Sequence, residues 1–217
     1  MPLYWVVTHG VPWHLYAPHS RIGNGLRFYR CEECSLVIKD PMVRANRAQE
    51  RAHYEKHNND LGDQGYRAHL LRLVEPLVSL LPRDAVGLDY GCGPVLSIEP
   101  LMRERGIRCV SYDPIFFPRR DLLTTDTYDY ISCCEVSEHF QEPGLEFSRL
   151  GAMLKPKGVL GVVTRRVPDD FEGWWYHRDP THVVFYSERT FEWIAECLGF
   201  ELIERRGDVV LARKRSP

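Results

Sequence analysis

The sequence predicts an α/β protein with a mostly parallel sheet, helices on both faces of the sheet and an antiparallel hairpin at the C-terminus. From residue 66 onward, short apolar runs alternate with segments whose apolar residues recur at helical spacing. Strands that alternate with helices form parallel sheets, because each helix carries the chain back across one face. A glycine-rich turn, residues 91–94, follows the first apolar run and precedes a helix. Together these features predict a Rossmann-like arrangement.

The individual elements follow from the periodicity of the apolar residues. A helix is predicted over 66–81, where apolar residues recur at spacings of three and four until Pro82 ends the pattern. Strands are expected at 85–90, 107–112, 128–134 and 159–164, and helices near 98–105, 143–154 and 187–198. The last two strands, 200–205 and 208–212, flank Arg206-Gly207 and predict the hairpin.

The composition is that of a soluble protein, and it excludes several classes. The chain has 217 residues, 44% of them hydrophobic and 27% charged, with a net charge of -2. This balance gives no strong nucleic-acid signature. No apolar run approaches the roughly 18 residues of a membrane span, and the N-terminus lacks the pattern of a secretory signal. Seven scattered cysteines indicate a reducing compartment, so a cytoplasmic location is expected.

Cys31 and Cys34, in the run Cys-Glu-Glu-Cys, are candidate zinc ligands. Two thiolates separated by two residues on a turn are typical of one knuckle of a zinc ribbon. A tetrahedral site needs two further ligands, and no cysteine precedes this pair. His9 and His14 stand in that part of the chain and complete a candidate Cys2His2 set. The alternative is a packed flap without zinc.

The turn Gly91-Cys-Gly93 and the acid Asp113 form the sharpest local signal. Glycines between a strand and a helix let the backbone approach a ligand, and the helix N-terminus favours anionic groups. Asp113 stands twenty residues after Gly93, at the end of the next predicted strand. A carboxylate at that place accepts hydrogen bonds from ribose hydroxyls. The simpler interpretation is a tight turn and a helix cap with no ligand.

Four motifs together resemble the class I S-adenosylmethionine-dependent methyltransferases. They are LDYGCGP at 88–94 with Asp113, YDYI at 128–131, EVSEH at 135–139 and LKPKG at 154–158. The resemblance covers about residues 66–214 and implies S-adenosylmethionine as cofactor. It places Asp89, Gly91 and Gly93 around the methionine moiety and Asp113 on the ribose.

The sequence departs from that family pattern in two places. Val95 stands where the third glycine of the usual turn is found. Only fifteen residues separate Asp113 from Asp129, too few for a normal helix and a third strand. These departures favour an alternative function, a non-catalytic binding module built on a degenerate methyltransferase fold with a zinc flap. The retained Asp113 and the EVSEH motif argue against it.

Three parts are expected along the chain. Residues 1–42 lack helical periodicity and form the zinc-ribbon-like segment. Residues 43–82 form a helical connector that covers the cofactor site, where His57 and Tyr66 are candidates to line the cover. Residues 83–217 form the methyltransferase domain.

Glu135, Glu138 and His139 follow a predicted strand, and His182 lies further along the chain. Strand ends at the C-terminal edge of a parallel sheet hold ligands in α/β folds. A mixed set of carboxylates and imidazoles suits a divalent cation such as Mg²⁺ or Mn²⁺. Without metal, the alternative is that Glu135 contacts the cofactor, Glu138 places a charge at a helix N-terminus, and His139 is packed or acts as a general base. The candidate catalytic residues are His139, His182 and Glu138.

The ExxEH motif with a later histidine resembles two groups of metal-assisted O-methyltransferases. One methylates the terminal 2′-hydroxyl of small RNAs, and the other methylates polyprenyl catechols in ubiquinone synthesis. Both act on vicinal hydroxyls, which a cation can chelate. The resemblance implies O-methylation of a small-molecule or nucleotide hydroxyl, with metal assistance.

Overall fold

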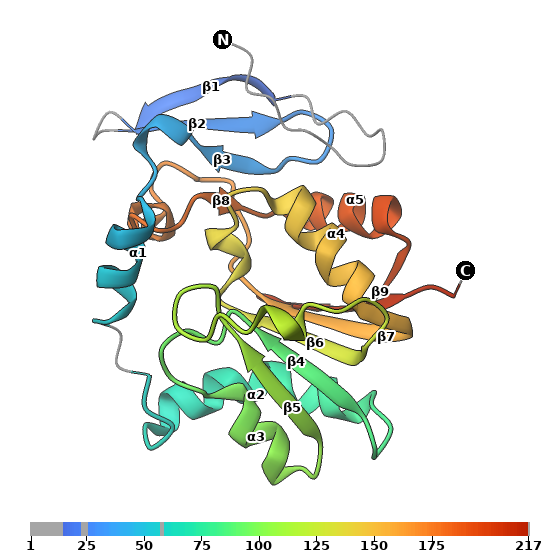
Figure 1. The fold of residues 1–217 in the computed structure, drawn as a ribbon. Coiled ribbons are helices and arrows are strands. Elements are labelled where there is room, and N and C mark those ends of the chain that lie inside the picture. The colour runs from blue at the N-terminus through green and yellow to red at the C-terminus, as the bar shows by residue number, and fades with distance from the viewer. Residues whose placement is uncertain (1–14, 23–25, 57–58, 217) are drawn as a thin grey trace.

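The computed structural model describes residues 15–22, 26–56 and 59–216. Its main sheet has six strands in the order β5-β4-β6-β7-β10-β9 (Figure 1). Four of them are parallel: β4 (Val86–Tyr90), β5 (Arg108–Tyr112), β6 (Tyr128–Cys134) and β7 (Leu154–Val163). The hairpin of β9 (Phe200–Arg206) and β10 (Val209–Lys214) adds antiparallel to β7. The predicted fold class is confirmed.

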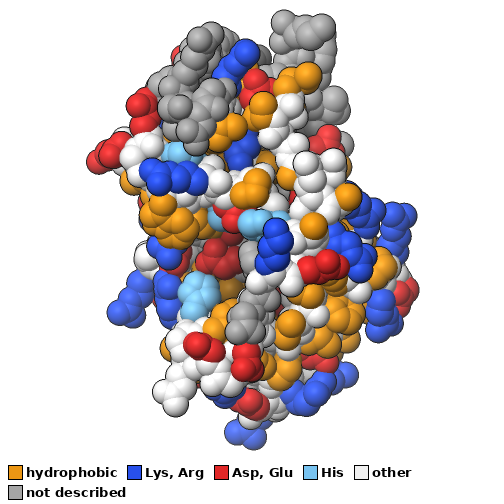
Figure 2. Space-filling view, turned by 90° about the vertical axis from the view of Figure 1, so that its left-hand side faces the viewer, with side chains coloured by type: hydrophobic (Ala, Val, Ile, Leu, Met, Phe, Trp, Pro, Cys, Tyr) orange, Lys and Arg blue, Asp and Glu red, His pale blue; other side chains and the backbone are white. Residues whose placement is uncertain are grey.

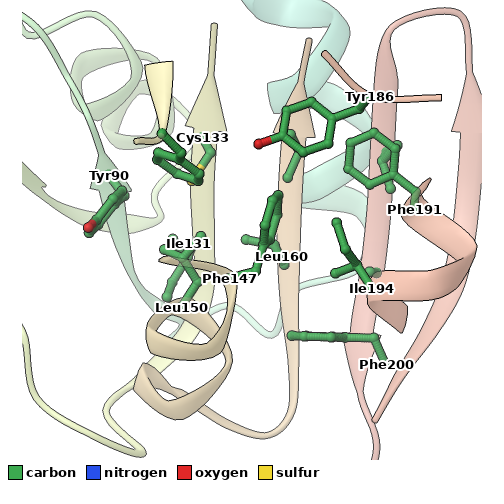
Figure 3. Packing of buried hydrophobic residues seen from close by; sticks show 14 of the residues in the cluster. Tyr90, Ile131, Cys133, Phe147, Leu150, Leu160, Tyr186, Phe191, Ile194 and Phe200 are labelled. Carbon is green, nitrogen blue, oxygen red and sulfur yellow. The ribbon is translucent and has the colours of Figure 1, made fainter. Parts of the chain in front are cut away.

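Helices cover both faces of this sheet. On one face lie α2 (Gln64–Ser79) and α3 (Ile98–Glu104), and on the other lie α4 (Pro143–Met153) and α5 (Glu188–Leu198). Their apolar stripes are buried against the strands, as the helical spacing predicts. Figure 3 shows α4 and α5 packed on the strands through Phe147, Leu160, Phe191, Ile194 and Phe200. The sheet therefore has a core on each side.

Local signals set the ends of these helices. Asp63 caps α2 by accepting a hydrogen bond from the Tyr66 backbone N–H at 2.8 Å. Ser187 and Thr190 form a reciprocal capping box at the start of α5. Gly199 ends α5 with φ of 70°, a left-handed conformation that glycine adopts without strain. Pro76 lies inside α2, and the helix ends at Ser79, three residues before Pro82.

The connection between β5 and β6 is short, as the spacing of Asp113 and Asp129 predicts. It holds only the 3-10 turn Arg120–Leu122. No strand pairs with the outer side of β5 among the described residues, so β5 is the edge of the sheet. In the described part of the chain, no helix combines the length and the apolar character needed to cross a membrane.

A second, antiparallel sheet lies above the α4 and α5 face (Figure 1). Its strands β1 (Leu15–Ile22), β2 (Leu26–Cys31) and β3 (Val37–Lys39) come from the N-terminus, and its fourth strand, β8 (Val184–Phe185), comes from the loop before α5. Cys34 lies on the turn between β2 and β3, and its carbonyl accepts a hydrogen bond from the Thr190 hydroxyl at 2.8 Å. The N-terminal strands are thus joined to the main domain by strand pairing and by a helix end.

The connector holds α1 (Arg47–Tyr54), which stands beside the C-terminal ends of the parallel strands (Figure 1). Asn46 and Gln49 cap it reciprocally. No residue of α1 is buried, but its side chains reach three loops, which hold Phe116, Gln141 and Asp179. Arg51 lies over the Phe116 ring at 5.4 Å, and His53 Nε2 lies 3.1 Å from Asp179 Oδ2.

Candidate functional site

A cavity of about 530 Å³ opens at the C-terminal ends of β4, β5 and β6. Glu50 and Tyr54 of α1 form part of its wall. Figure 2 shows this side of the molecule, where acidic and histidine side chains gather in a hollow near the middle. The strand ends of a parallel sheet are the usual ligand site of such folds. The cavity is therefore the candidate active site.

Gly91 and Gly93 shape the wall that follows β4. Both have positive φ, 82° and 67°, which explains glycine at each position. A Cβ on Gly91 would come within 2.4 Å of the Val136 side chain, so the turn and the loop after β6 are in close contact. A Cβ on Gly93 would meet nothing within 4 Å. The backbone at Gly93 is therefore open to a ligand in the cavity.

Asp113 lines the same cavity at the end of β5 and is buried. Its Oδ1 accepts hydrogen bonds from the backbone N–H groups of Ile115 and Phe116, at 2.7 and 2.9 Å. Its Oδ2 accepts one from Gly93 N–H at 3.1 Å. These bonds fix the carboxylate against the glycine turn. One lone pair of Oδ2 stays available for a ligand hydroxyl.

Asp89 lies behind the turn and not in the cavity wall. Its Oδ1 accepts a hydrogen bond from the Ser132 hydroxyl at 3.0 Å. Burial, together with the charges of Glu99 and Asp113, raises the pKa of this carboxyl to about 7. Its contacts in the structure are thus with the sheet, whereas the family resemblance places it at the methionine moiety.

Glu135 and Glu138 are linked by Tyr176, a residue that the sequence analysis did not single out. The Tyr176 hydroxyl donates to Glu138 Oε1 at 2.6 Å and lies 3.0 Å from Glu135 Oε2. Burial and the nearby charge of Glu135 raise the pKa of Glu138 well above its usual value. Burial favours a higher pKa for Glu135, but hydrogen bonds with His69, Glu138 and Tyr176 outweigh burial and lower the pKa. The two carboxyls therefore differ in their environments.

His69 is the second residue that sequence reasoning missed. It projects from α2, with Nε2 3.3 Å from Glu135 Oε1. The sequence gives no signal for it, because it lies on a helix that is otherwise explained by packing. Tyr176 has a weak signal, since it belongs to the aromatic run 174–186 before α5.

His139 and His182 both line the cavity and face each other, with ring centroids 4.9 Å apart. The Nδ1 of His139 lies 3.0 Å from the Thr181 carbonyl oxygen, and the Nδ1 of His182 lies 2.8 Å from that of Tyr176. A carbonyl oxygen only accepts, so each Nδ1 carries the proton. A neutral ring then presents Nε2 as a free lone pair.

The environment keeps both rings neutral. Burial and the neighbouring His182 lower the pKa of His139 to about 3. Burial also lowers the pKa of His182, and the opposite effect of Asp179 does not reverse it. Neutral imidazoles whose Nδ1 donates to a backbone carbonyl are the form in which histidine binds metals.

Glu138, His139 and His182 form a group whose ligand atoms all lie within 4.8 Å of one another. Glu138 Oε2 is buried and has no hydrogen-bond partner among the described residues. Two imidazole nitrogens and a carboxylate oxygen suit a divalent cation, so the residues fit such an ion. Of the four predicted ligands, Glu135 lies outside this group.

The other predicted residues fall in different places. Cys31 and Cys34 are buried on their turn, with their thiols hydrogen-bonded to each other. The hydrogen bond from Cys34 lowers the pKa of Cys31 to about 6, and the same pairing with burial raises that of Cys34. No described residue joins them as a third ligand. His9, His14 and His57 lie outside the described residues, and Tyr66 bonds Ser97 at 3.1 Å outside the cavity wall.

Comparison with protein families decides the identity of the domain. Residues 62–205 match a family model described as a methyltransferase domain. The chain belongs to this methyltransferase family. A search of curated protein sequences finds no match.

Solved methyltransferases share the fold. The 1,6-didemethyltoxoflavin-N1-methyltransferase of Burkholderia thailandensis, bound to 1,6-didemethyltoxoflavin and S-adenosylhomocysteine, is 15% identical with a TM-score of 0.58, over 93% of this chain and 100% of that one. An Archaeoglobus fulgidus SAM-dependent methyltransferase is 16% identical with a TM-score of 0.55, over 68% and 94%. A Thermotoga maritima SAM-dependent methyltransferase, described as a possible histamine N-methyltransferase, is 16% identical with a TM-score of 0.52, over 76% and 100%.

Family and fold together make the protein a class I S-adenosylmethionine-dependent methyltransferase. Membership of the methyltransferase family makes it an enzyme. The Burkholderia thailandensis methyltransferase of the same fold binds S-adenosylhomocysteine. These findings do not support the alternative of a non-catalytic binding module.

Proposed function

We propose that this methyltransferase methylates a hydroxyl of a small-molecule acceptor, with a divalent cation held by Glu138, His139 and His182. The observation that carries the proposal is the convergence of these three side chains. Both histidines present Nε2 because their Nδ1 atoms donate to backbone carbonyls. The buried Oε2 of Glu138 has no other hydrogen-bond partner among the described residues. Two imidazoles and one carboxylate suit Mn²⁺, Fe²⁺ or Zn²⁺, and suit Mg²⁺ less well because Mg²⁺ prefers oxygen ligands.

Gly91, Gly93 and Asp113 are proposed to hold the cofactor in the same cavity. Gly93 offers open backbone, and the Asp113 carboxylate faces the cavity with a free lone pair for a ribose hydroxyl. S-adenosylmethionine supplies an electrophilic methyl group, and a bound divalent cation lowers the pKa of a coordinated hydroxyl. The contribution of the protein is to orient both reactants within one cavity.

The charge of the cavity favours a neutral or cationic acceptor over a nucleotide. The acidic residues in its wall are Glu50, Asp113, Glu135, Glu138, Glu142 and Glu146. Among the described residues of the wall, Arg149 is the only arginine or lysine, and it pairs with Glu146 at 2.7 Å. Away from the cation, the ionised carboxylates of this wall disfavour a phosphate group. We therefore propose a small hydroxyl compound without phosphate, such as a vicinal diol.

The two histidines fit the role of a metal-free general base less well than the role of metal ligands. A base works best when its pKa is near the operating pH. Burial and His182 lower the pKa of His139 to about 3, so it is a weak base at neutral pH. A metal ligand needs the neutral ring, which this environment provides.

A structural zinc at Cys31 and Cys34 is a further part of the proposal. The two cysteines are adjacent on a tight turn, where the Ser35 N–H donates to the Cys31 carbonyl at 2.9 Å, as in one knuckle of a zinc ribbon. His9 and His14 are the proposed remaining ligands. A cytoplasmic location is proposed from the odd number of scattered cysteines.

Calorimetric titration with Mn²⁺ tests the catalytic cation. We expect one site, with affinity reduced at least about tenfold in His182→Gln and Glu138→Gln because each variant loses one ligand. His177→Gln is the matched control, since His177 is a buried histidine of the aromatic cluster outside the cavity wall. Methyl transfer to catechol should stop with EDTA and return with Mn²⁺ or Mg²⁺. Transfer that persists in EDTA would reject the cation.

A further inference from the structure

Lys39 is a lysine buried where the two sheets meet, with only 2% of its surface exposed. It is the last residue of β3, and its backbone N–H donates to the Val183 carbonyl at 2.8 Å. Its side chain turns back along the facing loop, and Nζ donates to the Asp179 carbonyl at 2.8 Å. One residue of the N-terminal sheet thus holds both ends of the loop 179–183.

This loop orients both histidines of the cation site. The Thr181 carbonyl within it accepts the Nδ1 proton of His139, and His182 is the next residue. The Asp179 carboxylate accepts from the Thr181 backbone N–H and hydroxyl, at 2.8 and 2.6 Å, which makes the loop a tight turn. A shift of the loop would therefore move the imidazole of His182 and the acceptor that fixes the tautomer of His139.

A buried ammonium group is costly for stability. Its charge loses hydration, and one carbonyl hydrogen bond compensates only part of that loss. Burial lowers the pKa of Lys39 to about 8, against the raising effect of Asp179, so the group is still mostly charged at neutral pH. A methionine would fill the same space without this cost. The buried charge of Lys39 is thus explained by the loop 179–183 that it holds in place, and not by a gain in the stability of the fold.

We propose that Lys39 is a positioning residue of the cation site, which makes the N-terminal sheet an integral part of the active centre. Lys39 acts through the loop 179–183 and touches neither the cation nor the substrate. The proposal rests on the proposed cation site for its metal readout, but the geometry of the histidines can be tested without any metal.

Lys39→Met tests the proposal. We expect Mn²⁺ affinity to fall about 10- to 100-fold, as for other residues that orient metal ligands, while the affinity for S-adenosylmethionine and the melting temperature do not fall. Lys155→Met is the matched control, because Lys155 pairs with Asp129 at 2.9 Å near the opposite ends of the strands. If Lys39→Met does not fold, Lys39→Gln, which keeps a shorter donor, serves in its place.

Nitrogen-15 NMR of the histidine rings gives the second readout. In the metal-free wild-type protein, His139 and His182 should both carry the proton on Nδ1, and Lys39→Met should give a mixture of tautomers at one or both. Unchanged ring spectra in the variant would overturn the role of Lys39. If the wild-type protein binds no Mn²⁺ but Lys39→Met still changes the tautomers, the cation is rejected, and Lys39 remains a residue that positions His139 and His182.

Discussion

Asp113 is the single side chain that ties the glycine turn to the proposed ribose site. It is fixed by three backbone N–H groups and faces the cavity. A carboxylate held this way needs no reorganisation when a ligand arrives, so its hydrogen bonds with a ligand cost little conformational entropy.

Asp113→Asn should weaken S-adenosylmethionine binding about 10- to 100-fold, because hydrogen bonds to a charged group are worth about 1.5–3 kcal/mol. The amide also brings a donor toward Gly93 N–H, so a lower melting temperature is expected as well. Calorimetry measures the affinity. Asp121→Asn, at an exposed residue paired with Arg119, is the control and should bind normally. Equal affinity in both variants would remove Asp113 from the cofactor site.

Asp89 gives a prediction about stability and pH. Burial raises the pKa of Asp89 to about 7, above the unfolded value of about 3.9. An acid with a raised folded pKa stabilises the protein most below the unfolded pKa, and this contribution is lost as the pH rises through 7. Asp89→Asn should abolish the loss, so the variant should gain melting temperature over wild type at pH 8 more than at pH 4.

Thermal unfolding of wild type and Asp89→Asn at these two pH values measures the effect. Asp84→Asn, at an exposed residue, is the control and should follow wild type at both. A difference between Asp89→Asn and wild type that does not change with pH would show that Asp89 is ionised in the folded protein throughout.

At the scale of elements, the turn between β2 and β3 is held by the start of α5. Thr190 and Ser187, which cap that helix, also donate to the Cys34 carbonyl. Arg189 donates to the carbonyl of Glu33 at 3.2 Å. The start of α5 therefore holds the backbone of the cysteine turn by hydrogen bonds, and zinc would add bonds to the thiols.

Purified protein should contain about one zinc per chain, and Cys34→Ser should reduce this content strongly because a thiolate ligand is lost. Elemental analysis measures it. Cys197→Ser is the control, since Cys197 is exposed on α5. If the wild-type protein lacks zinc and yet resists proteolysis over residues 26–42, the segment is a packed flap, and its burial alone holds it.

At the scale of the whole molecule, the two sheets share one core. Cys31, Leu36 and Ile38 belong to the same buried cluster as Tyr186 and Phe191 of the main domain. The pairing of β3 with β8 continues this contact through backbone hydrogen bonds. Because the apolar surface is shared, removal of one sheet would expose the core of the other.

Ile38→Ala should destabilise the entire protein by about 2–5 kcal/mol, since it leaves a cavity where the side chain is fully buried. Unfolding should stay a single transition when it is followed both by circular dichroism and by tryptophan fluorescence. Met42→Ala, at a residue 89% exposed, should change stability little. Two separate transitions in the wild-type protein would show that the N-terminal sheet folds independently.

The sequence by itself determined the main sheet and several residues of the cavity wall, among them Gly93, Asp113, Glu138, His139 and His182. Strand β6 and the start of α4 lie where the apolar pattern predicts them, because the spacing of apolar residues along the chain shows which face of an element is buried. The missing third strand follows from a simple count of residues after Asp113. The glycine turn and the motif at 135–139 are local signals of the same kind.

Only the tertiary structure decided which residues meet. Several contacts join residues more than 30 positions apart. They are the pairing of β3 with β8, the hydrogen bond from Lys39 to Asp179 and the hydrogen bond from Tyr176 to Glu138. No local period encodes such contacts, because they depend on how the loops pack after the sheet has formed. The same packing separates Glu135 from the three converging ligands and puts Asp89 behind the turn, and a spacing of residues along the chain cannot express either difference.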